Sequence, residues 1–440
     1  MNRWLVALLV TLAVIVLVAP GIVGRMAEKS VEESLNLAAS ENDDIVVTTE
    51  NFERGWFTSE GRHRIELRDG PVRALFENGS NEIDHAPSLI IDTHIDHGLL
   101  PVSSMSRDSG SLKPGLASTV STMKLDPGNG ELFDIPGKIY SDVGLTGAIA
   151  SRFLLQAGSD KFDDKTVEWQ GADVIVHTDP ETGSLAVKGD VSPWAVLAEN
   201  GGVNFGSLTI DADQEKSRYG LSVGSVRLEA GAITIENDYG PATGFDKLSL
   251  DANSELDGDR VNAAAKFDLS GLATPGISDI DIAMNVVLNR LDAQSSQKIA
   301  EVLRNAQASA DPDDALANMY PSIEADIQRL LAAGLEMRLE QLDITLPGGK
   351  LTTKLRFDLP DSDPAAVFSW PALLLALDAS ADIRLPIELF DMAEALSPDV
   401  GMLVAMGVFR KDGEFYEMRA EYAKGLLTVN GVPMPIPLGL

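Results

Sequence analysis

Apolar and polar residues alternate one by one along much of this chain, which is typical of β-strands that turn one face toward a core. Clusters of Gly, Asp and Pro separate the alternating segments and predict turns. The segments are Ile45–Thr49, His63–Leu67, Leu89–His97, Val167–Val176, Leu185–Val191, Leu208–Asp213, Leu221–Leu228, Ile233–Glu236, Leu248–Leu256, Val261–Leu269, Leu335–Thr345 and Lys350–Leu359. We therefore expect a mainly β (α+β) protein with an extended antiparallel β-meander, either a curled sheet or a closed sandwich.

A different spacing predicts a few helices. Ile299, Val302, Leu303 and Ala306 recur at helical intervals, and a second helical stretch from Leu316 to Leu331 is interrupted at Pro321 and stopped at Gly334. A short amphipathic helix is expected over Met26–Ser40 and another over Leu385–Leu396, while Asn430-Gly431 predicts a final hairpin turn.

The N-terminal region predicts a membrane anchor. Leu5 to Val23 contains no charged residue, and at ~1.5 Å per residue it is about 28 Å long, close to the ~30 Å hydrocarbon core. A cleaved signal peptide is the alternative, but its apolar core is usually about 7–15 residues and no small-x-small site follows here. Arg3 favours a cytoplasmic N-terminus. We expect a single-pass signal anchor in a bacterial inner membrane, with the rest of the chain in the periplasm.

These patterns divide the chain into four parts. Residues 1–25 form the transmembrane anchor, 26–290 a β-rich periplasmic region, 291–334 a helical insert, and 335–440 a C-terminal β-rich region that completes the same domain.

Composition excludes several classes of function. The formal net charge of −32 repels phosphate backbones, so nucleic acid is not an expected partner. The absence of cysteine excludes disulfides, thiolate metal sites and cysteine nucleophiles. The sequence also has no phosphate-binding loop and no Gly-x-Ser-x-Gly motif, and we expect neither a cofactor nor an enzymatic activity.

One polar string could carry metal chemistry. Asp92, His94 and Asp96 would share one face of a strand, while His97 would lie on the other. Three groups on one face could hold a divalent cation only with further ligands from elsewhere. Metal-dependent hydrolysis centred on these three residues is the enzyme alternative; a solvated polar strand face explains the pattern more simply, so we expect no catalytic metal.

Two segments match a known signature. Phe52–Ser59, with the sequence FERGWFTS, and Gly425–Pro433, with the sequence GLLTVNGVP, are similar to motifs of the YdgA-like family of bacterial envelope proteins, whose domain has no known function. A third family element, His-Gly-Pro, is only partly kept, because Leu99 follows His97-Gly98. The resemblance implies an inner-membrane anchor and a periplasmic domain, but no reaction. It indicates these candidate ligand or partner positions: Arg54, Gly55, Trp56, Phe57, His97, Gly98, Asn430 and Gly431.

The leading hypothesis is a non-enzymatic envelope protein with a binding or scaffold role. The pairs Leu208/Ile210, Val226/Leu228, Ile233/Ile235 and Leu248/Leu250 predict an elongated apolar surface that would face a lipid or a partner protein. A closed sandwich would bury the same residues, and the pattern leaves both arrangements open. A structural homo-oligomer is the further alternative.

Overall fold

The computed structural model describes residues 45–54, 58–67, 86–97, 117–126, 128, 132–144, 146–162, 165–179, 181–198, 201–237, 240–274, 276–307, 319–361, 370–396 and 399–434. The expected anchor, the expected helix over Met26–Ser40 and the site candidates Gly55, Trp56, Phe57 and Gly98 lie outside these residues. Within them, no helix has the length and apolar character needed to cross a membrane.

The prediction of a mainly β protein with antiparallel pairing and few helices is confirmed. The chain forms two compact units. Unit 1 comprises Met1–Lys216 with Asn305–Ala315, and unit 2 comprises Ser217–Arg304 with Leu316–Leu440. Each unit is described separately below.

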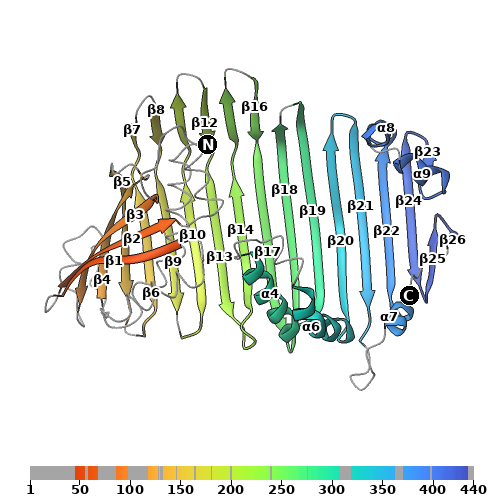
Figure 1. Cartoon of the computed structure of the whole chain (residues 1–440), viewed down its shortest axis with the longest axis horizontal. Coiled ribbons are helices and arrows are strands. Elements are labelled where there is room, and N and C mark those ends of the chain that lie inside the picture. The colour runs from red at the N-terminus through yellow and green to blue at the C-terminus, as the bar shows by residue number, and fades with distance from the viewer. Residues whose placement is uncertain are drawn as a thin grey trace. The chain divides into compact units, whose positions relative to one another are not determined.

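The main sheet of unit 1 has the strand order β1-β2-β3-β4-β5-β6-β9-β10-β13, with every neighbouring pair antiparallel (Figure 1). These strands are β1 (Ile45–Arg54), β2 (Thr58–Leu67), β3 (Ser88–His97), β4 (Ala117–Asp126), β5 (Phe133–Val143), β6 (Ile149–Leu155), β9 (Ala172–Asp179), β10 (Ser184–Val191) and β13 (Leu208–Lys216). A smaller ladder is formed by β7 (Gly158–Phe162), β8 (Lys165–Trp169), β11 (Trp194–Ala198) and β12 (Gly201–Phe205).

One face of the main sheet in unit 1 is a closed core. Ile91, Phe153 and Val174 are each only 1% exposed. Gly189 pairs with Val174, and a Cβ on this glycine would lie 2.8 Å from a Val174 methyl group. The valine therefore fills space that only a glycine leaves free.

The main sheet of unit 2 has the order β14-β17-β18-β19-β20-β21-β22-β24-β25-β26, again antiparallel throughout. Its strands are β14 (Ser222–Ala230), β17 (Lys247–Asp257), β18 (Arg260–Thr274), β19 (Ile277–Asp292), β20 (Leu335–Leu346), β21 (Gly349–Leu359), β22 (Asp378–Pro386), β24 (Phe415–Ala423), β25 (Leu426–Val429) and β26 (Val432–Met434). The short strand β23 (Arg410–Asp412) pairs with β24, and β15 (Ile233–Asn237) pairs with β16 (Gly240–Phe245).

The predicted last hairpin is confirmed. Asn430 and Gly431 connect β25 to β26 with φ angles of 51° and 77°, the left-handed pair that a type I′ turn requires.

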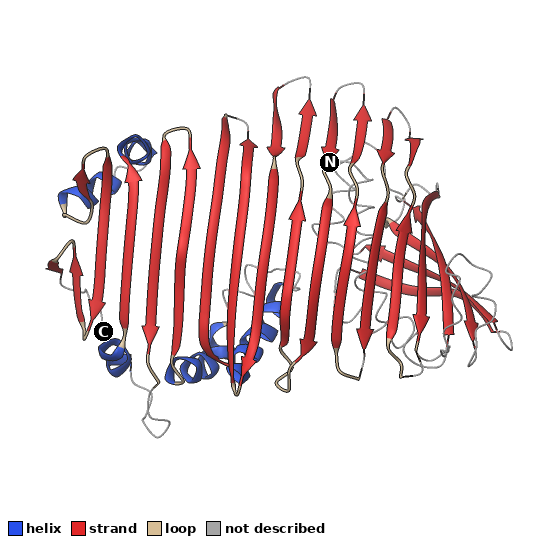
Figure 2. Cartoon of the chain, turned by 180° about the vertical axis from the view of Figure 1, so that it is seen from behind, coloured by secondary structure: helices blue, strands red, loops and turns tan. Residues whose placement is uncertain are grey.

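Helices lie near the ends of the strands in unit 2. They are α4 (Ala293–Gln307), α6 (Tyr320–Ala332), α7 (Trp370–Ala376), α8 (Ile387–Leu396) and α9 (Asp399–Ala405). In Figure 1, α4 and α6 lie in front of the strands, and in Figure 2, seen from behind, the strands lie in front of these helices. The expected helix near Leu385 is confirmed, and it begins at Ile387 directly after β22.

The helical stretch expected from Leu316 to Leu331 is described only from Met319 on, so the part before the expected interruption at Pro321 lies outside the described residues. Helix α6 begins at Tyr320, and Pro321 occupies its first turn. A proline in this turn removes no helical hydrogen bond, because the first backbone N–H groups of a helix have no partner within it.

Candidate binding surface

The main sheet of unit 2 separates apolar from polar side chains onto opposite faces. In one cross-strand row, Leu250 pairs with Phe267, Phe267 with Met284, and Met284 with Leu342. Parallel rows on the same side complete what we call the apolar face: Val226, Leu228, Leu248, Leu250, Ala252, Ala265, Phe267, Leu269, Ile282, Met284, Val286, Leu339, Leu342, Ile344, Leu351, Leu355, Ala381, Ile383, Met418 and Ala420.

A β-bulge keeps this face continuous in β20. The pairing of β20 with β21 shifts register between Leu339 and Leu342. Residues three apart in a regular strand lie on opposite faces, and one extra residue brings them back to the same face. The two polar residues between these leucines, Glu340 and Gln341, are the sequence signal for the bulge, and strict alternation misses it.

The centre of the apolar face is accessible to solvent. Phe267, Met284, Leu342 and Ile383 are half-buried, and Met337 in a neighbouring row is 38% exposed. Equivalent inward residues of unit 1 are almost completely buried. Among the described residues of unit 2, no second layer covers the middle of the sheet, so this unit does not form the closed sandwich that the sequence left open.

Helices border the apolar face at the strand ends. Val261, Leu335 and Leu359 are buried on this face at the end where α4 and α6 lie (Figure 1). At the β24 side, the ring of Phe390 in α8 packs on Tyr416 with centroids 4.1 Å apart, and the Tyr422 hydroxyl donates a 2.8 Å hydrogen bond to the carbonyl oxygen of Leu374 in α7. The apolar face therefore has an accessible centre and helices along its margins.

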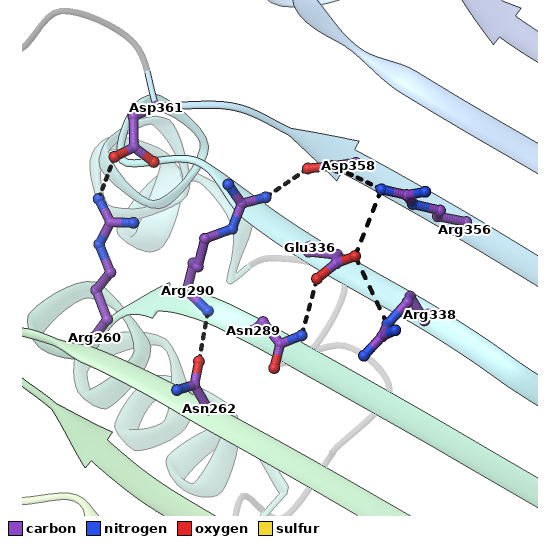
Figure 3. Close-up of polar contacts among 9 residues, drawn as sticks. All are labelled: Arg260, Asn262, Asn289, Arg290, Glu336, Arg338, Arg356, Asp358 and Asp361. Carbon is purple, nitrogen blue, oxygen red and sulfur yellow. Dashed lines mark hydrogen bonds and ion pairs between the residues drawn. The ribbon is translucent and has the colours of Figure 1, made fainter.

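The opposite face of the sheet carries ion pairs (Figure 3). Arg290 bonds Asp358 at 2.5 Å, and the Glu336 carboxylate accepts a 2.9 Å hydrogen bond from Asn289. Arg260 donates to Asp361 at 2.6 Å, and this hydrogen bond lowers the pKa of the Asp361 carboxyl. We interpret the polar face as the solvated side of the sheet.

A second bulge lies inside this polar network. Arg290 has a φ of 64°, and its backbone N–H donates to the Asn262 side-chain oxygen at 3.0 Å (Figure 3). The side chain satisfies a donor that the shifted ladder would otherwise leave without a partner.

The described motif candidates divide between the units. Arg54 and His97 end strands β1 and β3 of unit 1, where they pair with Ser59 and Ala117. Asn430 and Gly431 form the hairpin turn of unit 2. Asn430 is engaged on both sides: its oxygen accepts from the N–H of Arg419, and its amide donates to two backbone carbonyls. Its role in the described structure is to hold this turn.

The acidic string around His94 folds as an ion-paired strand. Asp92 accepts bonds of 2.6 and 3.1 Å from Arg62, so that carboxylate is occupied by a guanidinium. The two ring nitrogens of His94 contact Glu60 at 3.4 Å and Asp96 at 3.3 Å. Across the described ranges, no three His, Asp or Glu side chains are grouped to hold a metal ion.

By its fold this is a mainly β protein whose strands pair antiparallel, with one accessible apolar sheet face in unit 2. The amino-acid sequence places the chain more closely: residues 1–437 match the model of a bacterial protein family of unknown function (DUF945), and the chain belongs to this family. Searches of curated proteins and of solved structures gave no match.

Proposed function

We propose that this chain is a non-enzymatic protein of the bacterial envelope that binds the acyl chains of lipids along the apolar face of unit 2. The observation that carries the proposal is the accessible centre of that face, where Phe267, Met284 and Leu342 lie side by side across three strands. Exposed apolar areas beyond a few hundred Å² are uncommon in soluble monomers and usually mark a binding site.

The chemistry of the face favours acyl chains over an extended peptide. Apart from Thr353, its central rows contain Leu, Ile, Val, Ala, Met and Phe, and the backbone groups of the inner strands are already paired in the ladders. A peptide strand laid on this face would leave its own N–H and C=O groups without partners, which costs free energy. An acyl chain has no such groups.

The envelope location rests on the amino-acid sequence. The uncharged stretch from Leu5 to Val23 is long enough to span a bilayer, and the motifs at Phe52–Ser59 and Gly425–Pro433 are similar to those of the YdgA-like envelope proteins. An inner-membrane anchor would hold the apolar face close to a source of lipid.

Lipid binding is tested by photo-crosslinking the full chain in cells. A photoreactive amino acid replaces Ala381 in one strain and Ser380 in another. These are neighbours on β22 that point to the apolar and the polar face. We expect lipid adducts, detected by mass spectrometry, at position 381 and not at position 380. Equal labelling at both positions, or labelling at neither, would refute the proposal.

A matched pair of substitutions tests the same face. Ala381→Asp places a carboxylate among apolar side chains, while Ser380→Asp adds the same group to the solvated face. We expect Ala381→Asp to reduce the lipid recovered with the purified protein by at least about tenfold, since burying an unpaired charge is costly. Ser380→Asp should recover as much lipid as the unaltered chain.

Location is tested separately. Protease added to spheroplasts should digest the domain, and the mature protein should keep its N-terminal residues. A protected domain, or a mature N-terminus beyond Val23, would contradict the proposed topology.

A further inference from the structure

Helix α7 differs from an ordinary surface helix because its outward side is apolar. Pro371, Ala372, Leu375 and Ala376 are exposed, and their spacing places them on one side of the helix. Leu375 is 63% exposed. A surface helix normally turns polar residues toward water, and a helix that is apolar all round belongs in a core or a membrane.

A neighbouring turn extends this exposed surface. A side-chain methyl of Leu375 lies 3.0 Å from the position of a Cβ on Gly425, and the next residue, Leu426, is 53% exposed. We call the exposed residues Leu375, Ala376 and Leu426 the α7 patch. Lys424, which precedes Gly425 in the turn, is also exposed.

Helix α7, which carries two residues of the α7 patch, packs beside the apolar face. Leu374 accepts the hydrogen bond of Tyr422, and Tyr422 lies on the same side of β24 as Ala420 and Met418. Helix α7 therefore borders the apolar face at the end of the strands (Figure 1). Leu426 pairs with Ala423 and so lies on the other side of the sheet from Tyr422.

We propose that α7 inserts into a lipid bilayer and is the point at which acyl chains pass from the bilayer to the apolar face. This inference rests on the proposed function and names the partner surface of the same site. The helix has 7 residues and at ~1.5 Å per residue is about 10 Å long, far short of the ~30 Å hydrocarbon core. It reaches only the interfacial depth of a shallowly buried helix.

Apolar burial, and not charge, would drive this contact. The chain's net charge of −32 repels anionic headgroups, and α7 itself contains no charged residue. Lys424 lies in the turn beside the patch, and its exposed ammonium group would favour contact with lipid phosphates. Insertion should therefore persist at high salt, unlike binding through a basic patch.

Depth-dependent quenching tests the insertion directly. The chain has no cysteine, so Leu375→Cys and Ser380→Cys each provide one labelling site for an environment-sensitive fluorophore. The full chain is reconstituted in vesicles of phosphatidylethanolamine and phosphatidylglycerol with brominated acyl chains. We expect at least twofold quenching of the label at position 375, at low and high salt, and none at position 380. An unquenched label at position 375 would overturn the inference.

A second measurement connects insertion to loading. Leu375→Asp should lower lipid crosslinking at position 381 severalfold in cells, while the conservative Leu375→Met should preserve it. Lipid adducts at position 381 that do not change in Leu375→Asp would refute the role of α7 and leave the proposed function standing. No adducts at position 381 in any background would refute the proposed function itself. A protein adduct captured by a photoreactive group at position 375, without lipid, would assign the patch to a protein partner instead.

Discussion

Asn430, in the turn of the last hairpin of unit 2, exchanges two hydrogen bonds with Arg419 in the neighbouring strand β24. The N–H of Arg419 donates to the Asn430 side-chain oxygen at 2.9 Å, and the N–H of Asn430 donates to the Arg419 carbonyl at 2.7 Å. The Asn430 amide also donates to the carbonyls of Gly407 and Val408, at 3.0 and 2.9 Å. One side chain thus ties the turn to the segment that follows α9.

Removing this side chain should destabilise unit 2. Asn430→Ala loses three hydrogen bonds, at about 1 kcal/mol each, and places alanine at a left-handed φ that costs about 1–2 kcal/mol. We expect a loss of about 4–5 kcal/mol, measured by urea unfolding. Asn430→Gly should recover the backbone part of that loss. A cost below about 1 kcal/mol for Asn430→Ala would contradict the structural role.

The stability cost of replacing a phenylalanine by alanine should differ between the covered sheet face of unit 1 and the accessible apolar face of unit 2. Phe153→Ala in the closed core of unit 1 should cost about 3–5 kcal/mol. Phe267→Ala on the apolar face of unit 2 should cost less than about 2 kcal/mol, because the ring is already partly exposed to water. Hydrogen exchange in the strands of each unit provides the measurement. Equal costs would mean that the apolar face is covered.

Gly61 should be intolerant of a side chain because of His63. A Cβ at position 61 would lie 2.8 Å from the Nε2 of His63, whose ring is buried. We expect Gly61→Ala to destabilise unit 1 by about 1–3 kcal/mol through overpacking. In a double-mutant cycle with His63→Ala, the two costs should not add, since the smaller residue removes the clash. If the stability costs of the two substitutions added exactly, the contact with His63 would not be the cause of the destabilisation by Gly61→Ala.

His63 should also make unit 1 sensitive to acid. Burial lowers the pKa of His63 below its usual 6.5, against a weaker opposite effect of Asp92. The unfolded chain then binds a proton at a higher pH than the folded chain does. Neutral His63 makes its full contribution to the free energy of unfolding above pH ~6.5, the pKa of the unfolded chain. As the pH falls from there to the lower pKa of the folded chain, this contribution is lost by at most about 1.4 kcal/mol per pH unit.

The measurement is urea unfolding of unit 1 between about pH 7.5 and 5, with His63→Leu as the control. All histidines other than His63 are the same in both proteins, so only the difference between the two curves reports on His63. If the stabilities of the two proteins changed with pH in parallel, protonation of His63 would not destabilise unit 1.

The amino-acid sequence by itself determined which residues share a face and where the chain turns. Period-two alternation is a local property of extended backbone, so the rows through Leu248 and Leu250 follow from it, and Asn430-Gly431 specifies its turn through the φ angles it tolerates. Only the tertiary structure decided which faces are covered. Phe153 and Phe267 stand in similar alternating strands, yet one is buried and the other is partly exposed, because burial depends on what packs against a strand from distant parts of the chain.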